Sequence, residues 1–475
     1  MIPFGMLLLI LFLLMPQYAM VYTPRKVVDP PPKKPIRVVD SYTKKPIEGA
    51  LVTSGNDVER TDGNGMCYMK IEGNKVAARA CGYLRFEEII PTPQEKKPRP
   101  LTPKAICLSV YGIVNKALRG NGEVKNEKAV TTPREIKLVP FTPKALYLSF
   151  FGIGDRKLRA SALNLIQETE LNALVIDVKG DRGMICYKSA IPLASEVGAQ
   201  KIITVKDMEG LIKSLKEKGV YTIARIVVFK DNLLAMKMPD LAVKTQGGEI
   251  WRDREGLAWM DPFKKEVWDY NIHIAMEAAQ YGFDEIQFDY VRFPDAKGVQ
   301  FSMPNMQQNR VEAISGFLMK ARERLLPYNV FVSADIFGYV CWNLNDTCIG
   351  QSLEYLPSHL DYLSLMLYPS GFQYGIPGYR NPVTNPYEIV YLSLKRAQER
   401  TGLPSVRFRP WLQAFRDYAF DRRNFEEKEI RDQINAVKKS GSNSWMLWNS
   451  RNLYSRDGLK SDDAPGIAFQ SVRSQ

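Results

Sequence analysis

The chain has very little histidine: His273 and His359 are the two among its 475 residues. Zinc sites built on imidazole and Ser-His-Asp triads need several well-placed histidines. No GxGxxG or phosphate-loop motif follows any strand-like run, which argues against a bound nucleotide. We therefore expect no metal site and no cofactor, and we expect any chemistry to rest on carboxylates.

The chain also lacks an apolar run that would comfortably span a bilayer, which takes about 20 residues. The run from Gly5 to Met15 is shorter and fits the h-region of a secretory signal, although no Lys or Arg precedes it. We expect residues 1–21 to be a signal peptide or membrane anchor. The protein is then exported and extracellular, envelope-associated or membrane-anchored. A buried core strand is the alternative for this run.

The six cysteines include no CxxC pair. Outside the cell, Cys67 with Cys81 or Cys341 with Cys348 could form a disulfide. Cysteines also serve as plain buried hydrophobic residues. The sequence leaves the two interpretations open.

Positive charge is concentrated in the first third of the chain. Residues 1–144 carry 23 Lys and Arg against 13 Asp and Glu, which is +10 of the total net charge of +13. This excess fits attraction to an anionic cell-envelope surface, or simply a solvated linker. No basic helix or aromatic-interleaved motif accompanies it, so no nucleic-acid partner is expected.

Short strands and turns fill residues 35–92, after a Pro- and Lys-rich linker at 22–34. Even spacing of such strands predicts a small β-sandwich. The segments VVD (38–40), PIEGA (46–50), TDGNG (61–65) and ACGY (80–83) resemble the carboxypeptidase regulatory-like domain, an immunoglobulin-like module. That resemblance implies a spacer or adhesive role.

An internal repeat follows in residues 93–142, which we otherwise expect to be a linker. Residues 100–113 and 140–153 match at 9 of 14 positions. The second copy is expected to be the first strand of the next domain. The first copy is either a duplicated strand that closes the sandwich or one that packs on that domain.

Residues 143–455 alternate between apolar strand-like runs and helical stretches, ahead of a C-terminal tail at 456–475. This alternation predicts a parallel α/β fold, and eight strands buried on both faces favour a (β/α)8 TIM barrel over an open doubly wound sheet. The expected strands are 145–152, 173–178, 221–229, 285–293, 331–337, 362–368, 406–414 and 444–449.

Polar side chains interrupt these apolar runs near their carboxyl ends, where active sites of such barrels lie. Asp289 and Asp335 lie on neighbouring strands and could supply the acid and base of glycoside hydrolysis. We assign Asp289 as nucleophile or base and Asp335 as general acid, with Asp177 as the alternative for either role. A purely structural ion network is the competing interpretation, and Glu285 lies at the wrong end of its strand. Substrate contacts are expected from Asp181, Arg225, Arg292, Tyr368, Trp411, Gln413 and Trp448.

All seven tryptophans lie between Trp251 and Trp448. Indole faces suit stacking on sugar rings, and we expect Trp411 and Trp448 to line a sugar cleft. The remaining tryptophans are expected to be packing residues.

A family resemblance points the same way. The segments NALVIDVK (172–179), WDYN (268–271) and above all GFDEIQFDYVRFP (282–294) resemble the "putative glycoside hydrolase" domain of bacterial exported proteins. The resemblance covers about residues 143–455. It implies a TIM barrel and glycosidase activity on an envelope or extracellular polysaccharide or oligosaccharide. A non-catalytic carbohydrate-binding or wall-associated protein is the alternative, and a metal-dependent hydrolase or deacetylase fits poorly with two histidines.

Overall fold

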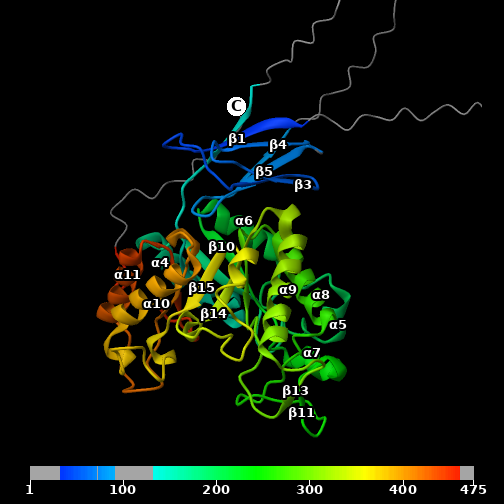
Figure 1. Cartoon of the computed structure of the whole chain (residues 1–475), viewed down its shortest axis with the longest axis vertical. Helices are drawn as coiled ribbons and strands as arrows, with labels where there is room; N and C mark the ends of the chain where they lie inside the picture. Colours follow the sequence, from blue (N-terminus) through cyan, green and yellow to red (C-terminus); the bar gives the residue numbers. More distant parts are fainter. Residues whose placement is uncertain (1–32, 72, 91–131, 461–475) are drawn as a thin grey trace, which may run out of the picture.

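The computed structural model describes residues 33–71, 73–90 and 132–460 (Figure 1). The expected signal segment, almost all of the 22–34 linker, the first copy of the repeat and most of the C-terminal tail lie outside these residues. The second repeat copy does form the first barrel strand, as expected, but that strand ends at Leu148 and a helix begins at Phe150, within the expected strand 145–152.

Eight parallel strands close into a barrel in sequential order, which confirms the predicted (β/α)8 fold. The last strand pairs with the first, so Trp445 lies opposite Lys144. The strands are β8 (Lys144–Leu148), β9 (Ala173–Lys179), β10 (Tyr221–Val227), β12 (Glu285–Asp289), β14 (Phe331–Phe337), β15 (Tyr362–Met366), β16 (Trp411–Gln413) and β17 (Trp445–Trp448).

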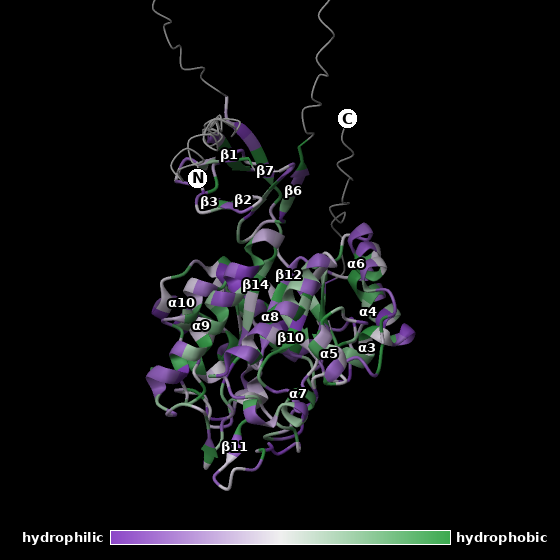
Figure 2. Cartoon of the chain, turned by 90° about the vertical axis from the view of Figure 1, so that its right-hand side faces the viewer, coloured by the Kyte–Doolittle hydropathy of each residue, from purple (hydrophilic) through white to green (hydrophobic). Residues whose placement is uncertain are grey.

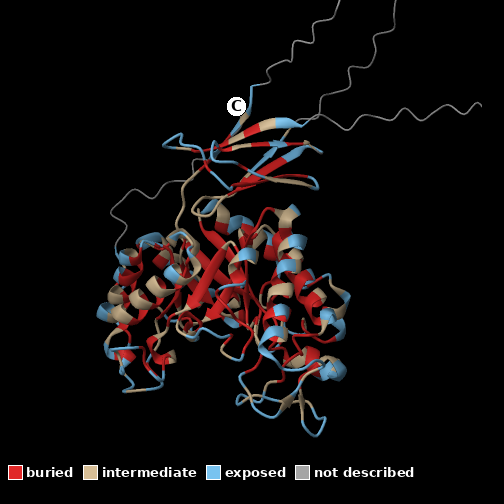
Figure 3. Cartoon of the chain, in the orientation of Figure 1, coloured by how far each residue is buried: buried red, intermediate tan, exposed pale blue. Residues whose placement is uncertain are grey.

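Helices surround the barrel, and the strands between them are buried on both faces (Figure 3). The first and last barrel strands meet without an edge, so no backbone row is left unpaired. The helices are α3 (Phe150–Gly154), α4 (Arg156–Glu168), α5 (Pro192–Glu196), α6 (Met208–Glu217), α7 (Asn232–Lys237), α8 (Lys265–Gln280), α9 (Gln307–Leu325), α10 (Pro386–Thr401) and α11 (Glu427–Ser440).

Helix α6 illustrates how local sequence sets these elements. Asp207 caps its amino end by accepting a hydrogen bond from the Gly210 amide at 2.8 Å. Met208, Ile212 and Leu215 are buried, with the spacing of three and four residues that places side chains on one helix face. The cap and the apolar face together fix where the helix starts and how it packs.

Strand β12 places three polar side chains inside the barrel at three levels. Because successive side chains alternate between faces, Glu285, Gln287 and Asp289 all point inward. Glu285, at the amino end, pairs with Arg409 and accepts a hydrogen bond from the Tyr221 hydroxyl. Asp289 lies at the carboxyl end. The expectation that Glu285 is at the wrong end for catalysis is confirmed.

The N-terminal region is β-sandwich-like, with two sheets ordered β4-β1-β7 and β3-β2-β5-β6. Apolar residues such as Ile36, Val52 and Val76 fill the space between the sheets. Membership of the carboxypeptidase regulatory-like family stays a prediction. The strands are β1 (Lys34–Asp40), β2 (Leu51–Ser54), β3 (Asp57–Arg60), β4 (Met66–Met69), β5 (Lys75–Arg79), β6 (Phe86–Ile89) and β7 (Arg134–Leu138).

Strand β7 corrects the expected 93–142 linker. It pairs in parallel with β1, from Ile36 opposite Arg134 to Asp40 opposite Leu138. Its alternating burial, with Ile136 and Leu138 inside, explains why it completes the sheet. This strand was not expected from the sequence because it is only five residues long and lies far along the chain from the other strands of its sheet.

The sandwich packs on the amino ends of the barrel strands, and Figures 1 and 2 both show it there. Arg85 pairs with Asp284, just before β12, at 3.0 Å. The Gly82 amide donates to the hydroxyl of Tyr362, the first residue of β15, at 3.0 Å. The short strands β11 (Lys244–Thr245) and β13 (Val299–Gln300) pair with each other at the opposite end. The carboxyl ends of the barrel strands therefore face away from the sandwich.

The described cysteines Cys67, Cys81, Cys186, Cys341 and Cys348 are all free, so neither of the two considered disulfides is formed. In the part of the chain that the structure describes, no helix is both long and apolar enough to cross a membrane.

Replacing Glu285 with Gln should destabilise the barrel by about 3–5 kcal/mol, because Arg409 would stay buried without a counter-charge. Denaturant unfolding followed by tryptophan fluorescence measures this, since every tryptophan lies in the barrel. The exposed Glu217→Gln is the matched control, with an expected change within about 0.5 kcal/mol. Equal stability of the two variants would contradict a structural role for the pair.

Candidate active site

Arg225, on β10, is the centre of the polar cluster at the carboxyl end of the barrel. Its side chain is almost fully buried, with 4% of the residue exposed. It makes ion pairs with Asp177 on β9 and Asp289 on β12, and its Nε lies 3.8 Å from Asp335 Oδ2 on β14. The three predicted catalytic carboxylates are thus brought together around one guanidinium.

Asp289 is held by donors on both of its oxygens. Arg225 donates to Oδ2 through Nε, at 3.0 Å, and through Nη2. The Tyr290 amide donates to Oδ1 at 2.6 Å. Tyr290 has a φ of 47°, a left-handed conformation that is uncommon for a non-glycine residue and costly to hold. The strand therefore ends in a strained turn that fixes the Asp289 carboxylate.

Asp335 lies in a different environment, although it is next to Asp289. Its side chain is 2% exposed, and its Oδ1 accepts a 2.7 Å hydrogen bond from the Trp411 indole. Burial raises the pKa of Asp335 well above its usual range, and the charge of the neighbouring Asp289 raises it further. Arg225 and Trp411 offset part of this. Asp335 therefore keeps its proton to a higher pH than an ordinary aspartate does.

Asp177 is the third carboxyl of the cluster. It accepts hydrogen bonds from Arg225 Nη1 and from the Tyr147 hydroxyl, both at 2.5 Å. Burial raises its pKa as well, against the lowering effect of Arg225 and Tyr147. Tyr147 also stacks on Trp448 with ring centroids 3.9 Å apart. With both oxygens occupied by buried partners, Asp177 fits a role in positioning Arg225.

Tyr368 and Arg292 are two predicted substrate contacts that are only partly buried. Burial and the charges of Asp335 and Asp289 raise the pKa of Tyr368. Arg292 lies over the rings of Trp259, at 4.9 Å, and Tyr290, at 5.3 Å. Its Nη1 donates to a backbone carbonyl, and it has no ion pair within the described residues.

Asp181 lies at the rim, with 40% of its side chain exposed. Its Oδ2 is 3.7 Å from Lys230 Nζ, which also pairs with Asp253 at 3.1 Å and Glu255 at 2.8 Å. Asp181 is therefore accessible to a ligand, and its role as a substrate contact stays a prediction.

Three predicted substrate contacts are placed differently from expectation. Trp411 is 1% exposed, so its face is not available for stacking on a sugar, and it instead orients Asp335. Gln413 is fully buried and bonds Ser370 and the Phe415 carbonyl. Arg225 is committed to the carboxylates. The sequence pattern identified which side chains point into the barrel. It could not show which of them lie near the open end and which lie deep in the barrel core.

Two residues of the site were missed in the sequence. Tyr147 lies on β8 two positions after Ala145, and both side chains point into the barrel. The alternation of inward and outward side chains along that strand could have predicted this position. Lys230 follows β10 outside any recognised motif, so only its contacts identify it. No group of three or more His, Cys, Asp or Glu side chains is arranged to hold a metal ion among the residues that the structure describes.

Asp289→Asn should lower the pKa of Asp335, because it removes the neighbouring charge that raises it. Carboxyl ¹³C NMR titration of wild type and variant measures the change. Asp240→Asn, at an exposed position in a loop helix, is the control and should leave this titration unchanged. An Asp335 titration that does not move in Asp289→Asn would contradict the coupling.

Comparison with family models gave a match over the barrel. The family model described as "Putative glycosyl hydrolase domain" matches residues 145–454. Curated proteins gave no match.

Solved structures resemble parts of the chain. A hypothetical protein from Ruminiclostridium thermocellum is 41% identical over 40% of this chain and 96% of its own, with a TM-score of 0.36. The PgaB (BpsB) glycoside hydrolase domain from Bordetella bronchiseptica is 15% identical over 66% and 95%, with a TM-score of 0.48. A Bacteroides thetaiotaomicron chitinase is 11% identical over 67% and 92%, with a TM-score of 0.40. Since the family model covers well over half of the chain, the protein belongs to this glycosyl hydrolase domain family.

Proposed function

We propose that the barrel hydrolyses glycosidic bonds of an envelope or extracellular polysaccharide by carboxylate chemistry. One observation carries the proposal: Asp289 is ion-paired with Arg225, while the adjacent Asp335 has a pKa raised by burial and by Asp289. Glycoside hydrolysis needs one ionised and one protonated carboxyl at the same pH. The pair meets that requirement at the end of the barrel where active sites lie.

In this proposal Asp335 is the general acid. It gives its proton to the glycosidic oxygen as the bond to the anomeric carbon breaks. Asp289 acts on the anomeric carbon, either by attacking it or by taking a proton from the attacking water. Arg225 pairs with Asp289 and orients it, and Trp411 orients Asp335 through its indole N–H. Asp177 acts through Arg225.

The substrate is bound by the residues between this pair and solvent. Tyr368 follows β15 at the carboxyl end of the barrel and is partly exposed, and its hydroxyl makes no hydrogen bond within the described part of the chain, so it is free to bind a sugar hydroxyl. Trp448 is half-buried, but Tyr147 covers one of its faces. Arg292 has no carboxylate partner among the described residues and suits a strongly polar or acidic substituent of the glycan. The exposed carboxylate of Asp181 extends the binding surface along the rim, and the buried Lys230 lies 3.7 Å from it.

The protein is also proposed to be exported and to act at the cell envelope. The apolar run from Gly5 to Met15 favours export, and the basic excess of residues 1–144 favours contact with an anionic envelope surface. Much of that charge lies outside the described residues. Because the sandwich packs on the amino end of the barrel, a sandwich attached to such a surface leaves the site facing away from it.

Asp289→Asn should lower the release of reducing ends from envelope polysaccharide by about 10²–10⁴-fold, because the group that acts on the anomeric carbon is lost. The melting temperature should stay within a few degrees, since Asp177 still neutralises Arg225. Asp240→Asn is the matched control and should keep wild-type activity.

Activity of Asp289→Asn equal to wild type would reject the assignment of Asp289. Binding of glycans by the wild type, with no release of reducing ends from any of them, would favour the alternative of a non-catalytic carbohydrate-binding barrel.

A further inference from the structure

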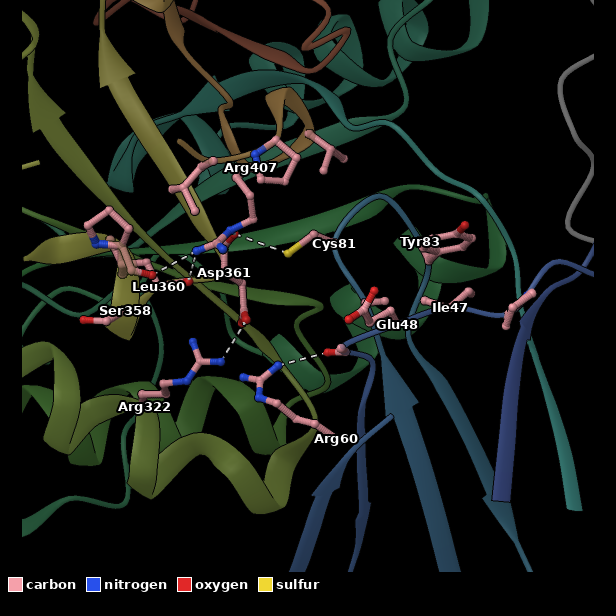
Figure 4. A pocket seen from close by; sticks show the side chains of 17 residues that line it. Ile47, Glu48, Arg60, Cys81, Tyr83, Arg322, Ser358, Leu360, Asp361 and Arg407 are labelled. Atoms are coloured by element: carbon pink, nitrogen blue, oxygen red, sulfur yellow. Dashed lines mark hydrogen bonds and ion pairs between the residues drawn. The ribbon is translucent and has the colours of Figure 1, made fainter. Parts of the chain in front are cut away.

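A cavity of about 720 Å³ lies between the sandwich and the amino end of the barrel, opposite the site described above (Figure 4). Its walls come from the β3 end and the loops of the sandwich, from α9, from the segment before β15 and from the segment after α10. Ligand-binding cavities of folded proteins span about 300–1,000 Å³. The space is therefore large enough for a small organic molecule.

Three arginines from separate elements line this cavity. Arg60 ends β3 of the sandwich, Arg322 lies on α9, and Arg407 ends the short helix η7 (Ser405–Arg407). Arg407 donates to the backbone carbonyls of Asp361, Leu360 and Pro357, which orient its guanidinium without neutralising its charge.

Negative charge in the cavity is smaller than this positive charge. Among the lining residues, Asp361 and Glu48 are the carboxylates. The Asp361 carboxylate pairs with Arg322 Nη2, at 3.2 Å, and with Nε of Arg79, which is not a lining residue, at 3.7 Å. Glu48 is exposed on the wall and makes no ion pair among the described residues. Arg60 and Arg407 make no ion pair with a carboxylate among the described residues, so the three lining arginines exceed the negative charge of the cavity.

Buried donors without acceptors are a second, independent observation that favours an anionic ligand. Nη1 of Arg322, a lining residue, is buried and has no hydrogen-bond partner among the described residues, and beside it the same is true of all three guanidinium nitrogens of Arg79, a residue that is 2% exposed. Such groups cost about 1–3 kcal/mol each when unsatisfied, and native proteins contain few of them. Burial lowers the pKa of Arg79 and the charge of Arg322 lowers it further, against the opposing effect of Asp361.

We propose that this cavity, lined by Arg60, Arg322 and Arg407, binds a phosphate-bearing anion that fastens the sandwich to the barrel. Guanidinium groups bind phosphate through paired, charge-assisted hydrogen bonds. Arg60 belongs to the sandwich, whereas Arg322 and Arg407 belong to the barrel, so one anion bridges both domains. The volume holds inorganic phosphate or a phosphorylated monosaccharide, and both present the same group to the arginines.

Isothermal titration of the whole protein with inorganic phosphate, against potassium chloride at equal ionic strength, tests the proposal. We expect one site per chain and a rise in melting temperature that follows phosphate occupancy. Arg60→Gln and Arg322→Gln should each weaken binding at least tenfold. Glucose 6-phosphate is the second probe: tighter binding than phosphate identifies a sugar phosphate as the ligand, and equal or weaker binding identifies the free anion.

Matched controls separate this site from general charge effects. Arg324→Gln removes the same charge from the exposed side of α9, and Arg37→Gln removes it from β1, and neither residue lines the cavity. Both should bind phosphate like the wild type. Arg60 makes one hydrogen bond, to the Gly49 carbonyl, so Arg60→Gln keeps the test informative if Arg322→Gln does not fold.

Phosphate binding that is absent in the wild type, or equal in Arg60→Gln and in the controls, would overturn the proposal. The Arg60→Gln variant should also keep wild-type hydrolysis, because this cavity and the carboxylate cluster lie at opposite ends of the barrel. The outcome of the phosphate titration therefore does not depend on whether the barrel has the proposed glycosidase activity.

Discussion

The ion pairs of Arg225 are the constraint on which the site depends. A buried guanidinium is costly unless it is paired, and here it draws Asp177 and Asp289 to it and lies within 4 Å of Asp335. Its hydrogen bonds fix the Asp289 carboxylate, and the charge of Asp289 in turn raises the pKa of Asp335. One cation thus separates two chemically identical carboxyls into different roles.

The architecture then sets what each end of the barrel can do. Strand β12 carries Glu285 at the amino end, where Arg409 makes it structural, and Asp289 at the carboxyl end. The sandwich covers the amino end, and the anion site proposed there lies in that interface. The interface with the sandwich and the carboxylate cluster therefore lie at opposite ends of the barrel axis.

Most of the fold was accessible from sequence because buried parallel strands are apolar and regularly spaced. All eight predicted barrel strands are present, and the inward position of Asp289 followed from strand alternation. The depth of each side chain within the barrel could not be predicted from the sequence. Trp411 and Gln413 were expected to contact the sugar but are buried. Residues two positions apart on a strand share a face, yet they lie at different heights along the barrel axis. Tyr147 and β7 were missed because their roles depend on partners remote in the sequence.

The central claim, that Asp335 is the protonated acid, is tested most directly by the pH dependence of kcat/KM. The rate of polysaccharide hydrolysis should fall as pH rises through the pKa of Asp335, because the proton to be donated is lost. The Trp411 hydrogen bond lowers that pKa, so Trp411→Phe should move the alkaline limb to higher pH. An alkaline limb that stays in place or moves to lower pH in Trp411→Phe would contradict the account.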